Sequence, residues 1–226
     1  MLGLVLTAAG SSVRFGGYAP KVLLPLAGVP VVVRAARPFR AAFPECAVVV
    51  TARPEDREAV ADALGRDPSL AGAIVVEGGQ TRQESVRRGL AALPDEVGVA
   101  LVHDAARPLA TVDLVRRVVG AAERDGAAAP ALPCSDTVHR VDADGRFVQA
   151  LPRSELRAAQ TPQAARLALL RRAYDEAARR GIEATDEVAL LLAAGFAVTA
   201  VPGDPDNMKI TTPDDLARAE SILRRR

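Results

Sequence analysis

Short aliphatic runs alternate with longer amphipathic segments along almost the whole chain, and this alternation restricts the fold more than any other feature. The runs typical of buried strands are residues 2–7, 46–51, 73–77, 97–103, 127–132 and 196–201. The segments typical of helices are residues 31–40, 54–65, 81–93, 111–126, 164–180, 185–195 and a last one from 212. Strands that alternate with helices pair in parallel and bury both faces of their sheet. The sequence therefore predicts an α/β fold, a three-layer sandwich with a mostly parallel, Rossmann-like sheet.

Threonines stand where several of these helices should begin. Ser, Thr, Asp and Asn side chains accept hydrogen bonds from the free N–H groups of a first helical turn. The threonines expected to do so are Thr81, Thr111, Thr185 and Thr212. Thr81 and Glu84 also have the spacing of a capping box. Pro38 favours an early end to the first helix, because proline cannot donate a backbone hydrogen bond.

Residues 137–151 interrupt the alternation. Two short β-prone runs flank Asp144 and Gly145, a pair typical of tight hairpin turns. A lone hairpin is marginally stable in water, so this one is expected to pack against something. A second subunit and the chain's own body both remain open at this point. We expect one domain over residues 1–226, with residues 134–153 as a protruding β-hairpin arm.

Composition excludes several classes of protein. The net charge of +1 provides no broad field for nucleic acid or an anionic membrane. No apolar run approaches the roughly 20 residues of a membrane span, and the first basic residue, Arg14, comes too late for a signal peptide. Cys46 and Cys134 form no CxxC pair, which favours free thiols over a zinc site. We therefore expect a cytoplasmic protein that contacts neither nucleic acid nor membrane.

Chemistry-bearing residues follow the carboxyl ends of the predicted strands, where α/β sheets bind their ligands. The first loop reads TAAGSSVRFGG and leads to Pro20 and Lys21. Small residues let backbone N–H groups approach phosphate oxygens, and Arg14 and Lys21 add positive charge. The loop has neither the GK[ST] of a Walker A motif nor the GxGxxG of a dinucleotide fold. It predicts a grip on a nucleoside triphosphate.

Lysine is rare in this chain. Lys21 and Lys209 are the only lysines among 29 basic residues, and both fall in predicted carboxyl-end loops. Lysine is a compact point charge, whereas the guanidinium of arginine is a wide planar fork. The two exceptions therefore indicate two placed cations rather than two ordinary surface lysines.

Several motifs together resemble one enzyme family. TAAGSSVRFG with PKVLLPLAG looks like the signature of sugar-phosphate nucleotidyltransferases. EGGQTRQESVRRGL, VHDAARP, the late ATDE and NMKITTPDDL narrow the resemblance to the 2-C-methyl-D-erythritol 4-phosphate cytidylyltransferases of the non-mevalonate isoprenoid pathway. The resemblance runs along the whole chain in order.

The resemblance implies a reaction and its partners. Family members join CTP to methylerythritol phosphate with Mg²⁺ and release pyrophosphate, by in-line attack of the acceptor phosphate on the α-phosphorus. Both reactants are anions, so charge neutralisation and alignment are the main tasks. Arg14 and Lys21 would stabilise the α-phosphate, and Arg153 and Lys209 would hold the acceptor. The hairpin would cross to a second subunit, so that Thr137 and Arg153 serve the neighbouring site of a homodimer.

The resemblance also assigns the substrate pockets. The residues expected around CTP are Ala8, Ala9, Gly10, Gly79, Gln80 and Ser85. Those expected around the acceptor or the ribose are Asp104, Ala105, Arg107, Thr137, Thr161, Thr185 and Asp186. The triphosphate would supply most ligands of the metal, and Asp104 is the candidate protein ligand. Relatives often carry an acidic residue at the position of Gln80, so the nucleoside contact there differs in this chain.

Three other functions compete with this interpretation. A cytidylyltransferase for ribitol 5-phosphate or a molybdopterin-type acceptor would share the first loop, whereas Arg153, Thr185, Asp186 and Lys209 suit a small phosphorylated polyol. A non-catalytic nucleotide-binding protein would not need cations directed at a second substrate. A dinucleotide-dependent oxidoreductase is disfavoured because GxGxxG and the acidic ribose reader are missing.

Overall fold

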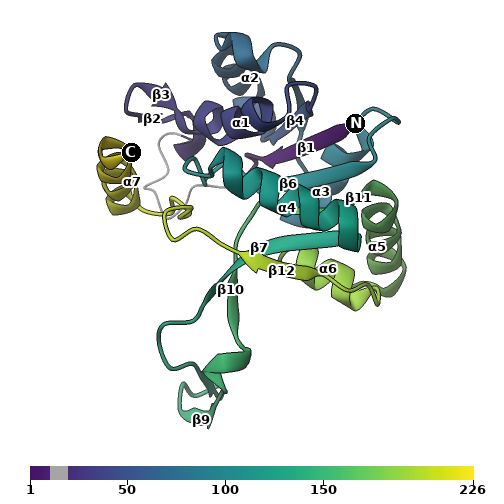
Figure 1. The fold of residues 1–226 in the computed structure, drawn as a ribbon, viewed down its shortest axis with the longest axis vertical. Helices are drawn as coiled ribbons and strands as arrows, with labels where there is room; N and C mark the ends of the chain where they lie inside the picture. Colours follow the sequence, from purple (N-terminus) through teal and green to yellow (C-terminus); the bar gives the residue numbers. More distant parts are fainter. Residues whose placement is uncertain (11–19) are drawn as a thin grey trace.

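The computed structural model describes residues 1–10 and 20–226. Within them, eight strands form one sheet in the order β10-β7-β11-β6-β1-β4-β5, with β12 pairing with β7 (Figure 1). The strands are β1 (Leu2–Thr7), β4 (Ala47–Ala52), β5 (Ile74–Glu77), β6 (Val99–Asp104), β7 (Ala127–Pro133), β10 (Arg157–Ala159), β11 (Gln163–Arg166) and β12 (Thr199–Pro202).

The centre of the sheet is parallel, as predicted. β1 pairs in parallel with β4 and β6, β4 with β5, and β7 with β12. β10 and β11 are antiparallel to their neighbours. The parallel strands β1 and β6 end side by side, with Thr7 opposite Asp104. This register brings the first loop next to the loop that follows β6.

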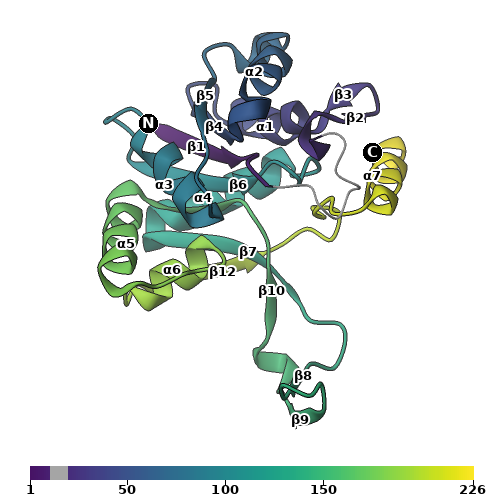
Figure 2. The ribbon, with the colours of Figure 1, turned by 180° about the vertical axis from the view of Figure 1, so that it is seen from behind.

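Helices cover both faces of the sheet and complete the predicted three-layer sandwich (Figures 1 and 2). On one face lie α1 (Val31–Ala42), α2 (Arg57–Gly65) and α4 (Val112–Asp125). On the other lie α3 (Arg82–Ala91), α5 (Leu167–Arg180) and α6 (Glu187–Ala193). Short 3₁₀ helices occur at η2 (Lys21–Leu23), η3 (Pro54–Asp56), η4 (Pro68–Leu70) and η5 (Arg153–Glu155).

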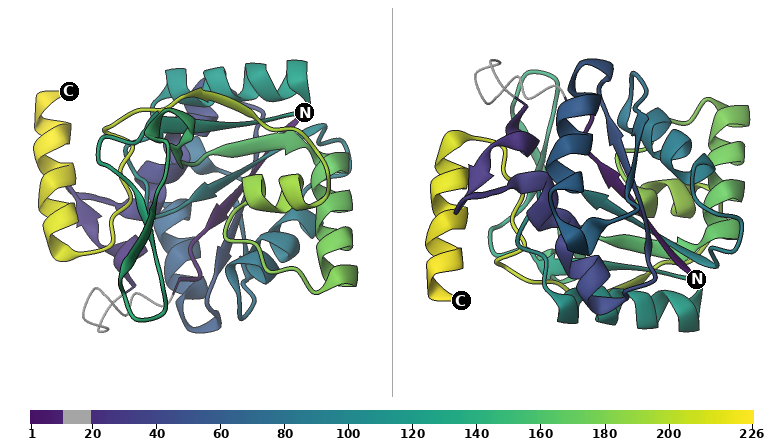
Figure 3. Two further views of the ribbon diagram at one scale, coloured as in Figure 1. Left: turned by 90° about the horizontal axis from the view of Figure 1, so that it is seen from below. Right: turned by 90° about the horizontal axis from the view of Figure 1, so that it is seen from above.

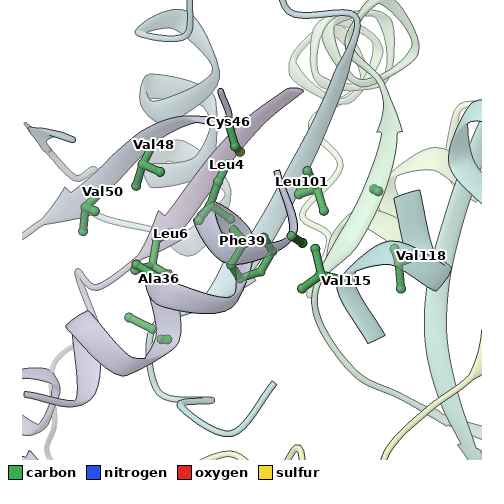
Figure 4. Packing of buried hydrophobic residues seen from close by; sticks show 14 of the residues in the cluster. Leu4, Leu6, Ala36, Phe39, Cys46, Val48, Val50, Leu101, Val115 and Val118 are labelled. Atoms are coloured by element: carbon green, nitrogen blue, oxygen red, sulfur yellow. The ribbon is translucent and has the colours of Figure 1, made fainter. Parts of the chain in front are cut away.

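Alternation along β1 divides the core between these two layers. Leu4 and Leu6 pack toward α1, where the ring of Phe39 lies among them (Figure 4). Val5, between them in sequence, belongs to the opposite cluster with α3 and α5. This period of two is what a strand buried on both faces requires. Aliphatic burial on both faces holds β1 rigidly under the site at its carboxyl end.

A third cluster fixes the C-terminal helix α7 (Pro213–Arg225) against the small strands β2 (Pro25–Leu26) and β3 (Val29–Pro30), at the edge of the molecule (Figure 3). Leu26, Ile210 and Ile222 are buried in this cluster. The Ile210 N–H also donates to the Ala106 carbonyl over 2.7 Å. Together these contacts place the segment containing Lys209 beside the loop that follows β6.

The hairpin extends away from the sandwich as an arm (Figures 1 and 2). Its strands are β8 (His139–Val141) and β9 (Phe147–Ala150), and the Asp144–Gly145 turn lies between them as predicted. Apolar side chains on the arm face solvent in the isolated chain, and Phe147 is 77% exposed.

No described helix is long and apolar enough to cross a membrane.

The structure corrects the start of the helix predicted from residue 164. Residues Gln163–Arg166 form β11, and the helix α5 begins only at Leu167. Ala164 and Ala165 favour a helix by intrinsic propensity. Here β11 lies between β6 and β7 and pairs with both, so tertiary pairing overrides that preference.

Other helix boundaries also differ from the predictions. Helix α1 continues through Pro38 to Ala42. Asp186, not Thr185, caps α6 by accepting the Ala189 N–H over 2.8 Å. Thr81 caps α3 as predicted, but the Glu84 carboxylate accepts the N–H of Gln80, so the reciprocal half of the capping box is absent. Thr111 and Thr212 cap α4 and α7 as predicted.

Candidate active site

A cavity of about 400 Å³ opens at the carboxyl ends of β1 and β6. Five separate stretches of the described chain contribute to it. Its described lining residues are Thr7, Ala8, Ala9, Gly10, Lys21, Val22, Gly79, Gln80, Thr81, Arg82, Ser85, Asp104, Ala106, Lys209 and Thr211. This is the position at which open α/β sheets bind their ligands.

The predicted CTP residues lie together on this cavity. Ala8, Ala9 and Gly10 leave β1, and Gly79, Gln80 and Ser85 approach from β5 and α3. Lys21, the first residue of η2, also lines the cavity. Arg14 lies outside the described residues, so its place relative to Lys21 is not assigned.

Gly78 allows the two loops to come close. A Cβ atom on Gly78 would lie 2.6 Å from the Cβ of Ala9, which is far inside van der Waals contact. Its N–H donates to the Ala52 carbonyl over 2.7 Å, so the backbone there has little freedom to withdraw. Any side chain at this position would push the 78–81 loop away from the first loop and widen the cavity.

Side chains at the start of α3 fix the shape of the 78–81 loop. The Gly79 N–H donates to the Ser85 hydroxyl over 3.0 Å, and that hydroxyl donates to the Thr81 carbonyl over 2.9 Å. The Gln80 N–H donates to the Glu84 carboxylate over 2.9 Å. The loop is therefore held by its own helix, with the Gln80 side chain left exposed beside the cavity.

Asp104 is the centre of charge in the site. Its carboxylate lies 2.8 Å from Lys209 Nζ, 3.5 Å from Arg82 Nε and 3.7 Å from Arg107 Nε, and its side chain is only 9% exposed. The Thr7 hydroxyl donates to the same group over 3.4 Å. Three cations from three different segments thus meet on one buried carboxylate.

These charges determine the ionisation of Asp104. Burial alone would raise the pKa of its carboxyl group, but the positive charges of Lys209, Arg82 and Arg107 outweigh burial and hold the pKa well below its usual range. Asp104 is therefore an anion at every physiological pH. It offsets part of the positive charge that the site presents to an anionic ligand.

His103 supports Asp104 from inside the sheet. Its ring is fully buried, with Nε2 3.0 Å from the Arg107 carbonyl and Nδ1 2.8 Å from the Thr161 hydroxyl. The Thr161 hydroxyl also accepts the Asp104 N–H over 3.1 Å. Since the carbonyl can only accept, we assign the proton to Nε2, and Thr161 then donates to Nδ1. The neutral imidazole thus locks Asp104, Arg107 and Thr161 together.

The described lining of the site offers one carboxylate that a metal bound to the substrate could contact. Asp104 is the only carboxylate among the described lining residues, and the described chain contains no cluster of three or more metal-ligating side chains. Mg²⁺ is commonly held by one or two carboxylates together with phosphate oxygens and water. Among the described residues, the Asp104 oxygen that faces Arg82 and Thr7 has only the longer contacts, 3.5 and 3.4 Å. That oxygen fits a single metal contact, with the remaining ligands coming from a triphosphate.

The predicted acceptor residues are divided between three places. Arg107 and Thr161 contact Asp104, as described above, whereas Ala105 is fully buried and donates its N–H to the Thr7 carbonyl. Thr185 lines a second cavity of about 290 Å³, which shares Thr81 and Arg82 with the first.

Thr137 and Arg153 lie at the arm instead. Both are exposed, and Arg153 donates to the Ser135 carbonyl over 2.7 Å. Neither is among the described residues that line the main cavity. Within this single chain, the arm therefore does not complete the site beside Asp104.

Sequence reasoning missed several lining residues, above all Arg82. The motif EGGQTRQESVRRGL contains Arg82, but nothing local distinguishes it from the neighbouring Arg87 and Arg88. Its distinctive feature is its contact with Glu187, 105 positions further along the chain. Thr7, Ala106 and Thr211 were also missed, although their positions next to predicted site residues were a usable signal.

The fold and the cavity define an α/β protein with a cavity lined by Lys21, Arg82 and Lys209 at the carboxyl ends of its parallel strands. Residues 2–225 match the family model for 2-C-methyl-D-erythritol 4-phosphate cytidylyltransferase. The chain belongs to that family, which confirms the resemblance of its motifs.

Individual relatives agree over nearly the whole chain. The chain is 45% identical to a 2-C-methyl-D-erythritol 4-phosphate cytidylyltransferase of Frankia casuarinae, over 98% of this chain and 80% of the relative. It is 50% identical to a bifunctional enzyme IspD/IspF of an Anaeromyxobacter species, and it spans 56% of that longer protein.

Solved structures of the family are similar as well. The 2-C-methyl-D-erythritol 4-phosphate cytidylyltransferase of Thermus thermophilus has a TM-score of 0.76 and 38% identity, over 97% of this chain and 98% of that one. The 4-diphosphocytidyl-2C-methyl-D-erythritol synthase of Anaerococcus prevotii has a TM-score of 0.86 and 26% identity, over 99% and 98%.

The buried histidine predicts a pH dependence of stability. Burial lowers the pKa of His103 from 6.5 to about 4, so the folded protein keeps the ring neutral where the unfolded chain takes up a proton. The free energy of unfolding should fall as the pH drops through this window, by about 3 kcal/mol between pH 7 and pH 4. His103→Gln cannot titrate and should lack this loss.

Urea denaturation of both proteins at several pH values measures the difference. Carboxylates that titrate at lower pH, such as Asp215 with a pKa of about 2, are common to both proteins and cancel in the comparison. Equal pH dependence in the two proteins would show that the buried ring does not titrate as argued.

Proposed function

We propose that this protein transfers the cytidylyl group of CTP to 2-C-methyl-D-erythritol 4-phosphate and releases pyrophosphate, as the names of its relatives describe for them. The observation that carries the proposal is the placement of Lys21 and Lys209 on one cavity, at the carboxyl ends of β1 and β6. The second of these cations, held by Asp104, suits a second anionic substrate.

The reaction needs alignment and charge neutralisation rather than a base. An oxygen of the acceptor phosphate attacks the α-phosphorus of CTP, a new P–O bond forms, and the bond to the bridging oxygen breaks as pyrophosphate leaves. The nucleophile is already an oxyanion, so no proton has to be removed. Positive charge fixed beside the α-phosphate is worth most in the transition state, where negative charge shifts toward the leaving group.

In this proposal Lys21 and Arg14 stabilise the α-phosphate, and the two loops hold the nucleotide. The small residues Ala8, Ala9 and Gly10 allow the close approach of phosphates. In this proposal Gly79, Gln80 and Ser85 lie around the cytidine. Because Gly78 has no side chain, the two loops stay close together, and the space between them suits a pyrimidine. Support comes from their common place on the cavity.

The acceptor would lie on the Asp104 side of the cavity. In this proposal Lys209 and, from a second subunit, Arg153 hold its phosphate. Arg107, Thr161, Thr185, Asp186 and the region of Ala105 surround the polyol. Asp186 already accepts hydrogen bonds from Ala189 N–H and the Gln163 amide. In this proposal its remaining lone pairs accept a hydrogen bond from the polyol, while its bond to Ala189 holds the start of α6.

We propose Mg²⁺ as the cofactor, bound mainly by the triphosphate, with Asp104 as the protein residue able to reach it. When bound, the ion neutralises negative charge on the phosphates and favours departure of pyrophosphate. The chain's own contribution is to fix the Asp104 carboxylate among Lys209, Arg82 and Arg107 before substrates arrive.

We further propose a homodimer in which the arm of one subunit reaches the site of the other. Phe147, Val148 and Val141 on the arm are exposed in the single chain, at 77%, 54% and 49%. Contact with a partner would cover them and would bring Thr137 and Arg153 to a cavity that they do not reach within their own chain.

Cys46 and Cys134 are free thiols, consistent with a cytoplasmic location.

The proposed activity is tested by measuring pyrophosphate release with Mg²⁺, each of the four nucleoside triphosphates, and either methylerythritol phosphate or ribitol 5-phosphate. We expect release with CTP and methylerythritol phosphate, and rates at least about tenfold lower in the other combinations, which corresponds to about 1.4 kcal/mol of discrimination. No release with the expected pair refutes the proposed function. Faster release with ribitol 5-phosphate identifies a different acceptor.

Shared sites predict complementation between subunits. Lys21→Ala should lose about 10²-fold or more in kcat, the loss typical of removing one electrostatic contact to the transition state. Arg153→Ala should instead weaken use of the acceptor and so lower kcat/KM for it. In a mixed dimer, one of the two sites receives both the wild-type Lys21 and the wild-type Arg153. Co-expressed, differently tagged subunits should therefore recover activity toward half that of the wild type. Mixed dimers as inactive as both parents would place Arg153 and Lys21 in the same subunit's site.

A further inference from the structure

Arg82, on the wall of the cavity, is held by a carboxylate that does not belong to the described lining. Glu187, the first residue of α6, accepts from both terminal nitrogens of the Arg82 guanidinium, each over 2.9 Å. The Glu187 side chain is only 2% exposed. Paired bonds between a guanidinium and a carboxylate fix direction as well as distance. The orientation of Arg82 is therefore set by Glu187.

This orientation turns the third nitrogen of Arg82 toward the site. Arg82 Nε lies 3.5 Å from one Asp104 oxygen, and Lys209 Nζ lies 2.8 Å from the other. A continuous chain of ionic contacts thus runs from Glu187 through Arg82 and Asp104 to Lys209. It connects α6 to the loop that the proposed function assigns to the acceptor phosphate.

Glu187 is itself fixed from several sides. The Tyr174 hydroxyl, on α5, donates to it over 3.1 Å. The Gln163 carboxamide accepts the Val188 N–H over 3.0 Å and donates to the Asp186 carboxylate over 3.0 Å, which ties the start of α6 to β11. Glu187 is accordingly a rigid reference point rather than a mobile surface carboxylate.

The balance of charge shows what Glu187 contributes. Arg82, Arg107 and Lys209 carry three positive charges, and Asp104 and Glu187 carry two negative ones. Without Glu187, all three cations would depend on the two oxygens of Asp104. Arg82, whose side chain is 28% exposed, would turn its terminal nitrogens to Asp104 and compete with Lys209 for it, because Asp104 is its other carboxylate neighbour among the described ion pairs.

We propose that Glu187 is a positioning residue for the acceptor half of the site. By occupying the terminal nitrogens of Arg82, it leaves Asp104 to hold Lys209 in place for the acceptor phosphate. The role of Lys209 rests on the proposed function. The role of Glu187 is an addition to it, and it acts on substrate only through Arg82 and Asp104.

Steady-state kinetics of Glu187→Gln test this role. Displacement of Lys209 should raise the KM for the acceptor about tenfold and lower kcat about 10- to 100-fold, the range expected when reacting groups are misplaced by about 1 Å. The KM for CTP should stay within about twofold, because the hydrogen bonds described above for Gly79, Gln80 and Ser85 do not involve Glu187. Loss of folded protein alone would lower kcat and leave both KM values unchanged. Glu176→Gln, which removes a carboxylate paired with Arg179 and Arg180 on α5, is the matched control and should behave as wild type.

Two more variants keep the test decisive if Glu187→Gln folds poorly. Glu187→Asp retains the charge but is one methylene too short to keep both bonds to Arg82, so it should show the same rise in acceptor KM. In an Arg82→Gln background, adding Glu187→Gln should cause no further change, because Glu187 acts through Arg82.

The outcomes separate this inference from the proposed function. A wild-type protein without cytidylyltransferase activity refutes the function itself. An active wild type overturns the role of Glu187 if Glu187→Asp keeps the wild-type acceptor KM. The role of Glu187 is also overturned if the fold-changes in acceptor KM caused by Arg82→Gln and Glu187→Gln multiply in the double variant.

Discussion

The candidate site depends on one buried carboxylate. Asp104 stands at the end of β6, and three cations converge on it: Lys209, Arg82 and Arg107. The three cations come from distant parts of the sequence, so the carboxylate joins the end of the sheet, the start of α3 and the segment before α7. Like charges gathered this closely would repel one another without a fixed anion between them. Asp104 therefore makes it possible to hold these three cations close together beside the cavity.

The rest of the fold keeps that carboxylate in place. Aliphatic burial on both faces of β1 fixes the strand beside it, and His103 and Thr161 hold its backbone from the opposite side. The cluster of α7 on β2 and β3 positions the segment that carries Lys209. Most of these contacts are apolar or neutral, so the core fixes the backbone from which the charged side chains extend, and the ion pairs then orient the side chains themselves.

The sequence predicted what depends on local pattern. The β1 strand, the caps at Thr111 and Thr212, and the two isolated lysines on one cavity all follow from periodicity, turn chemistry or composition. It failed where distant segments decide the outcome. β11 is a strand because β6 and β7 flank it, despite the helical preference of its alanines. Arg82 gains its role from Glu187, a partner that no local pattern connects to it.

The central claim is that Asp104 acts by holding Lys209, and a double-mutant cycle on this pair tests it most directly. Asp104→Asn, Lys209→Met and the double variant are compared with wild type by kcat/KM for the acceptor. Contact between the two groups predicts that Asp104→Asn costs less once Lys209 is gone, by a coupling free energy of about 2 kcal/mol or more. Independent effects, additive to within about 0.5 kcal/mol, would contradict the account.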